Sequence, residues 1–185
     1  MMTTFQRLLG TFVALVASLG LHAAPWVERP ADEGTGRRLR QTFLATTAAK
    51  LGASPTSRFP HVYGVAIDWP VGDMTATVIS ASDGTASLYT TSSFGIIGGG
   101  YHADVRKAAL RLVSLANRHV GDASPTSDYP YPAPGKVRFY FLTYAGVRTI
   151  ETGLETIEAG SSPFRALFGA GQDVITELRL ISRKP

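Results

Sequence analysis

Cysteine is absent from the 185-residue chain, which excludes disulfide bonds, thiolate zinc sites and cysteine nucleophiles. Charged residues are also scarce, at 17% of the sequence against a usual share of about a quarter. The formal net charge is only +4, and the basic residues are scattered apart from two short clusters, Arg37-Arg38-Arg40 and Arg183-Lys184. Nucleic-acid-binding proteins usually carry a basic stripe interleaved with aromatic residues. The sequence therefore predicts no nucleic-acid partner.

No apolar run is long enough to cross a bilayer, because residues 8–21 fall short of the roughly 20 residues required. Arg7, this uncharged run and the small residues before Pro25 are nevertheless the parts of a secretory signal peptide over residues 1–24. Two alternatives stay open: an N-terminal apolar helix that packs on the domain, and a wrongly assigned start at Met1-Met2. The helix alternative rests on apolar residues at helical spacing, namely Phe5, Leu8, Leu9, Phe12, Leu15, Val16 and Leu19.

The location of the protein depends on that N-terminal segment. A real signal peptide implies an exported or periplasmic protein, and otherwise the protein is expected in the cytoplasm. Membrane contact is expected only through the N-terminal segment if it is not cleaved. Residues 25–36 contain two prolines and two glycines and predict a linker. Residues 37–185 are expected to form a single α+β domain, as their number suits one core.

Strand patterns begin at residue 62. Residues 62–69, 75–82 and 85–92 are rich in β-branched and aromatic residues, which favour strands. The dipeptide Asp83-Gly84 between the last two runs is typical of a type I′ hairpin turn. The sequence therefore predicts three consecutive antiparallel strands.

A second hairpin is predicted from residues 136–144 and 147–152, joined at Ala145-Gly146. Apolar and aromatic residues occupy both alternating faces of residues 136–144. A strand that is covered on both faces belongs near the middle of a sheet.

Helices are predicted over residues 102–120 and 162–181 from their apolar spacing, with a weaker candidate over 37–52. The expected fold is α+β, with a five-stranded antiparallel sheet built as a three-strand meander, a helix, a two-strand hairpin and a helix. This order is close to profilin-like and roadblock-like architectures by analogy alone. The roadblock pattern has two strands before its crossover helix, whereas three are predicted here.

The Pro/Ser-rich loop 121–135 is long for a compact domain. One interpretation is that residues 130–134, "PYPAP", form a polyproline II docking ligand. The other is an ordinary crossing loop that lays Tyr129 and Tyr131 on the surface, and composition alone favours this second interpretation.

A glycine-rich turn, "FGIIGGGYH" over residues 94–102, lies between a predicted strand and a predicted helix. Helix N-termini after such turns attract anions. The glycine spacing matches neither the dinucleotide fingerprint nor the P-loop. Two interpretations follow: a ligand or anion site, or a turn where backbone must approach backbone closely. The candidate ligand-binding residues are Gly98, Gly99, Gly100, Tyr101 and His102.

Catalytic motifs are not found. No serine lies in a G-x-S-x-G motif, and the histidines His22, His61, His102 and His119 are not at metal-binding spacing on one element. Asp68 is expected to make turn hydrogen bonds rather than acid–base chemistry. We therefore predict no catalytic residue, no metal and no cofactor, and the chain is expected not to be an enzyme.

The segments "DGTASLY", "GIIGGG" and "VRFYFLT" occur in this order within residues 58–181. In this pattern the chain resembles a family of small bacterial proteins to which no activity is attached. The resemblance implies that the apolar N-terminus is an addition to the shared domain. It implies no substrate and no catalytic residue.

The function expected from these observations is binding or protein–protein interaction without catalysis, with a homodimer or another protein as the partner. Aromatic residues beyond the needs of one core favour an exposed interaction surface. The alternative is a small-ligand or anion site at residues 94–102, which would also be compatible with an enzyme. Sheet edges and helices are the expected contact elements, by fold analogy alone.

Overall fold

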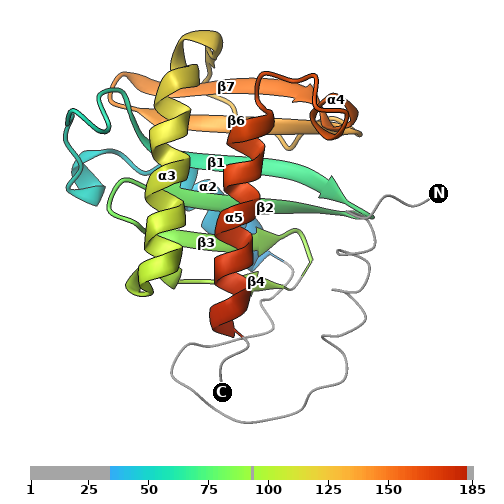
Figure 1. Cartoon of the computed structure of the whole chain (residues 1–185), viewed down its shortest axis with the longest axis horizontal. Coiled ribbons are helices and arrows are strands. Elements are labelled where there is room, and N and C mark those ends of the chain that lie inside the picture. The colour runs from blue at the N-terminus through green and yellow to red at the C-terminus, as the bar shows by residue number, and fades with distance from the viewer. Residues whose placement is uncertain (1–33, 93, 183–185) are drawn as a thin grey trace.

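The computed structural model describes residues 34–92 and 94–182. One antiparallel sheet of seven strands organises these residues, in the order β4-β3-β2-β1-β6-β7-β5 (Figure 1). The strands are β1 (Val62–Val71), β2 (Met74–Ala81), β3 (Ala86–Thr90), β4 (Gly95–Ile96), β5 (Ser124–Pro125), β6 (Lys136–Thr143) and β7 (Gly146–Gly153). The fold is therefore α+β, but the prediction of a five-stranded sheet is wrong.

The two unpredicted strands lie at the two edges of the sheet. β4 and β5 contain two residues each, which is too short to show the alternation that identifies a strand in a sequence. β4 lies in the segment interpreted as a glycine turn, and β5 lies in the Pro/Ser-rich loop. Pro125 in β5 also argues against a strand interior, although it is tolerated at an edge. The five predicted strands correspond to β1, β2, β3, β6 and β7.

The helices are α2 (Thr35–Leu44), α3 (Ala103–His119), α4 (Leu154–Glu158) and α5 (Arg165–Ser182), with 3₁₀ turns η1 (Ala49–Leu51), η2 (Gly99–Tyr101) and η3 (Val120–Asp122). The weak helix candidate 37–52 is divided into α2 and η1, with Thr46 and Thr47 between them. α2 begins within the predicted linker 25–36, most of which lies outside the described residues, as does the predicted signal peptide 1–24. None of the described helices is long and apolar enough to span a membrane.

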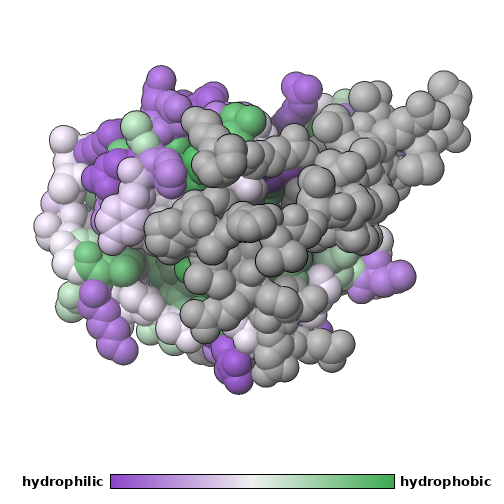
Figure 2. Space-filling model, turned by 90° about the horizontal axis from the view of Figure 1, so that it is seen from below, coloured by the Kyte–Doolittle hydropathy of each residue, from purple (hydrophilic) through white to green (hydrophobic). Residues whose placement is uncertain are grey.

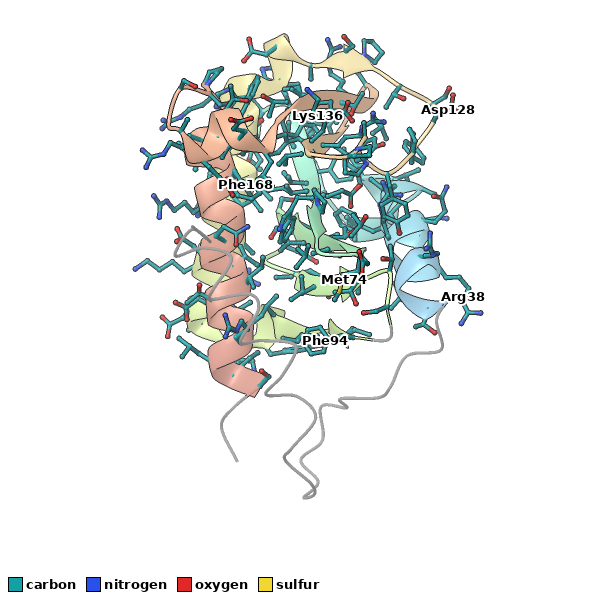
Figure 3. The ribbon with its side chains drawn as sticks, turned by 90° about the vertical axis from the view of Figure 1, so that its right-hand side faces the viewer. Arg38, Met74, Phe94, Asp128, Lys136 and Phe168 are labelled. Carbon is teal, nitrogen blue, oxygen red and sulfur yellow. The ribbon has the colours of Figure 1, made fainter. Side chains whose placement is uncertain are left out.

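The helices cover the sheet unequally. α3 and α5 lie side by side on one face, and the shorter α2 lies on the other face (Figures 1 and 3). Alternate residues of β1 serve the two layers: Ile67 and Trp69 pack under α3 and α5, while Ala66 packs in the cluster under α2. Strand β6 is paired on both sides and supplies Phe139 to the first layer and Tyr140 to the second. Each large side chain buried in this way stabilises the fold by about 1.5–3 kcal/mol.

Helix α5 continues through two glycines that differ in their surroundings. A Cβ atom added to Gly171 would lie 2.7 Å from Cδ1 of Ile67 and 3.4 Å from Cγ1 of Val78, so Gly171 marks a close approach of helix and sheet. A Cβ added to Gly169 would meet no atom within 4 Å. The two glycines are therefore a matched pair, one required by packing and one not.

We expect Gly169→Ala to raise the free energy of unfolding by about 0.5–1 kcal/mol, because alanine favours helix over glycine. Gly171→Ala should lower it by about 1 kcal/mol, because overpacking of about 1–3 kcal/mol outweighs the same helix gain. Urea denaturation followed by circular dichroism measures both changes. Equal effects of the two substitutions would show that α5 does not press on β1 at Gly171.

Candidate functional site

The glycine turn before α3 is a point of backbone packing. Gly98 has a φ of +81°, which glycine adopts without strain. Gly99 is buried, and a Cβ added to it would collide with the Leu178 and Val105 side chains. A Cβ added to Gly100 would lie 2.8 Å from the carbonyl oxygen of Gly84, in the β2–β3 turn. Close approach of α5 and the β2–β3 turn therefore accounts for two of these glycines.

The five predicted ligand-binding residues lie together on this turn, with different roles. The Gly98 amide faces the Ser87 hydroxyl oxygen at 3.4 Å, and the His102 amide donates to the Gly99 carbonyl at 3.0 Å. Tyr101 and His102 are exposed. These two contacts are internal to the fold. An anion site at these residues stays a prediction.

Gly100→Ala should lower the free energy of unfolding by about 1–3 kcal/mol, because the added methyl group meets backbone atoms that cannot move independently. Gly121→Ala is the control, since a Cβ there meets no atom within 4 Å. Thermal and urea unfolding measure the two effects. A fully stable Gly100→Ala variant that lost affinity for pyrophosphate would favour the anion site instead.

Two exposed apolar side chains lie on the same turn, and a third lies near the end of α5. In the described part of the chain, the large hydrophobic residues singled out by their exposure are Ile97, Tyr101 and Leu180, at 56, 99 and 50%. Ile97 and Tyr101 flank Gly99 on the turn, whereas Leu180 follows Leu178 by two positions on α5 and therefore points away from the side on which Leu178 contacts Gly99. We call these three residues the β4-end surface. Figure 2 views the molecule from this end, and hydrophobic (green) and hydrophilic (purple) residues both appear on the part of the surface that is coloured.

A buried ion pair occupies the opposite face of the sheet. Arg40 from α2 donates from Nη2 to Asp68 of β1 at 2.5 Å and from Nε at 3.0 Å. The Thr77 hydroxyl donates to the same carboxylate at 2.5 Å. Arg40 also donates from Nη1 to the carbonyl oxygen of Tyr129 at 2.9 Å, and its guanidinium lies 4.2 Å from the centre of the Tyr131 ring. The ion pair therefore ties α2 and the 121–135 loop to the sheet.

Burial perturbs both partners of this pair. Burial raises the pKa of the Asp68 carboxyl, and the hydrogen bonds and charge of Arg40 oppose that rise. Burial alone would lower the pKa of Arg40, but hydrogen bonding to Asp68 and its charge raise it. Perturbed carboxyls often mark active sites. Here the side chains are 3% and 0% exposed, so no substrate reaches them, and the pair is structural.

The expectation that Asp68 makes turn hydrogen bonds is wrong. Asp68 lies inside β1, between the buried residues Ile67 and Trp69, and points to the α2 face. Two features of the sequence indicate the pair. Asp68 is a charged residue within a strand pattern, and Arg40 lies three residues before the apolar Phe43 of α2. Pairing them requires knowing that α2 crosses this face.

Asp68→Ala should destabilise the protein by about 3–5 kcal/mol, because it leaves the Arg40 guanidinium buried without a counter-charge. The double variant Arg40→Met/Asp68→Leu should recover at least half of that loss. Asp173→Ala is the control: its exposed pair with Arg111 should contribute less than about 1 kcal/mol. Urea denaturation measures all three. Similar losses from Asp68→Ala and Asp173→Ala would contradict a special role for the buried pair.

The histidines are dispersed in the structure. His61 precedes β1 and is exposed, His102 precedes α3, and His119 lies 3.2 Å from Asp122 through Nδ1. His22 is outside the described residues. Within residues 34–92 and 94–182, no group of three or more potential ligands is placed to hold a metal ion.

Comparisons with protein-family models, with curated protein sequences and with solved structures found no match. The resemblance to a family of small bacterial proteins therefore stays a prediction, as does the analogy with profilin-like and roadblock-like folds.

Proposed function

We propose that this protein is a non-catalytic binding domain that associates with a second copy of itself through the β4-end surface. The observation that supports the proposal is the pair of exposed apolar side chains, Ile97 and Tyr101, on one turn, with exposed Leu180 near the end of α5. Exposed apolar residues scattered singly are ordinary, but grouped ones mark interaction sites. The turn beneath them is held by close backbone packing, so the surface is preformed.

The sheet edge beside this surface lacks the usual protection against pairing. Edge strands are normally guarded by charged residues or proline. β5, at the other edge, contains Pro125. By contrast, residues 85–101, which include β4, contain neither a charged residue nor a proline. β4 is short, so apolar side chains would supply most of the contact and backbone pairing only a little.

The lack of charge favours a second copy as the occupant. A symmetric dimer brings the same patch of both subunits together. Any charge near the two-fold axis therefore lies close to the identical charge of the partner subunit. Like-charge contacts at an interface cost several kcal/mol. An uncharged stretch avoids this repulsion.

The alternative function, a small-ligand site at residues 94–102, has less support. The space next to Gly99 and Gly100 is filled by residues of the same chain, chiefly Leu178, Val105 and the Gly84 carbonyl. Tyr101 and His102 remain exposed beside it and would have to form such a site largely alone.

Sedimentation velocity of the full chain over a range of concentrations tests the proposal. Wild-type protein should show a monomer–dimer equilibrium. Ile97→Asp should weaken dimerisation by about tenfold or more, because it removes an apolar contact and sets two carboxylates against each other across the axis. Tyr101→Ser should act in the same direction. Ser127→Asp, an exposed site in the loop far from β4, is the control and should change nothing.

A wild-type chain that stays monomeric at all concentrations would overturn the proposal. A dimer that is insensitive to both Ile97→Asp and Tyr101→Ser would do so as well, since its interface would lie elsewhere. Circular dichroism of each variant confirms that the fold is retained.

A further inference from the structure

A hollow of about 380 Å³ lies on the other half of the sheet from β4, where β6 turns into β7 and α3 ends in η3. Small-molecule sites usually have volumes of about 300–1,000 Å³ and mostly apolar walls. Here Pro55, Pro60 and Val120 contribute apolar wall, together with Tyr144 of the β6–β7 turn. The volume suits a small organic molecule with an apolar body.

Hydrogen bonds fix the walls of this hollow. The Tyr144 amide donates to the His61 carbonyl at 3.2 Å, and the Tyr144 hydroxyl donates to the Ser54 carbonyl at 2.7 Å. The His61 amide in turn donates to the Asn117 side-chain oxygen of α3 at 2.9 Å. The segment before β1, the hairpin turn and α3 are thus held together. A preformed site loses less conformational entropy on binding.

The lining of the hollow includes one charged side chain, that of an arginine. Arg148 of β7 lines it and donates from Nε to the Ala123 carbonyl at 2.9 Å and from Nη2 to the same oxygen. That partner is neutral, whereas Arg40, Arg111 and Arg138 each bind a carboxylate. His61 adds an imidazole to the rim. Arg148 is therefore a positioned cation whose charge is not matched by a bound carboxylate in the structure described.

We propose that this hollow binds the carboxylate of a small monocarboxylic acid with an apolar body. The body would lie against Pro55, Pro60 and the Tyr144 ring, and the carboxylate would accept hydrogen bonds from the free edge of the Arg148 guanidinium. Charge-assisted bonds from arginine to carboxylate are among the stronger polar contacts in proteins. The site is separate from the β4-end surface and does not depend on self-association.

Isothermal titration calorimetry of the full chain with phenylacetate as the probe tests this site. Phenylacetate should bind. Phenylacetamide lacks the charge and acetate lacks the apolar body, so the affinity of each should be lower than that of phenylacetate by about tenfold or more. Arg148→Gln should reduce phenylacetate affinity to the level of phenylacetamide. Arg111→Gln is the control, because this exposed arginine pairs with Asp173 between α3 and α5.

Arg148→Gln also removes the bonds to Ala123, so a second variant separates binding from folding. Gly121 lines the hollow, and a Cβ there meets no atom within 4 Å. Gly121→Leu should fill the hollow, abolish phenylacetate binding and leave the melting temperature unchanged. The proposal is overturned if phenylacetate does not bind the wild-type chain, binds no better than phenylacetamide, or binds Gly121→Leu equally well.

Discussion

The ion pair between Arg40 and Asp68 holds together three parts of the chain that are distant in sequence. It joins α2, the central strand β1 and, through the Tyr129 and Pro130 carbonyls, the loop that precedes β6. A buried pair of this kind adds little net stability compared with apolar residues of the same size, but losing one partner is costly. Its main effect is to specify position: α2 has one place on the sheet where its guanidinium is satisfied.

This arrangement makes the two faces of the sheet different in kind. The α3–α5 face is held by a continuous apolar core, in which side chains are closely packed. The α2 face combines a smaller apolar cluster with directional bonds around one charged group, and Tyr140 donates a further hydrogen bond to the Pro130 carbonyl at 2.6 Å. The "PYPAP" stretch is consequently engaged by its own domain, in agreement with a crossing loop whose tyrosines pack on the fold.

Much of the fold follows from local sequence signals, and the parts that do not follow have physical reasons. Long strands and helices are recognised from the alternation or helical spacing of their apolar residues. For this reason β1 to β3, β6, β7, α3 and α5 could be predicted from the sequence. Two-residue edge strands carry no period, and they are defined only by the neighbours they pair with. The glycine turn was recognisable as a turn, but its crowding by Leu178 depends on where α5 ends. The hollow beside Arg148 is formed by three segments of the chain, and no one of these segments has a sequence pattern that indicates a binding site.

The pairing of β1 with β6 has a consequence for how the chain is made. Ile67 lies opposite Phe139, about 70 residues later in the sequence, and contacts between such distant residues slow folding. On a ribosome adding about 5–20 residues per second, the edge of β1 that receives β6 waits roughly 4–14 seconds for its partner to be synthesised. During that interval the β1–β3 meander lacks the strand that pairs with the other edge of β1. The newborn chain is therefore most exposed to wrong pairing, and most in need of chaperone protection, before Phe139 leaves the exit tunnel.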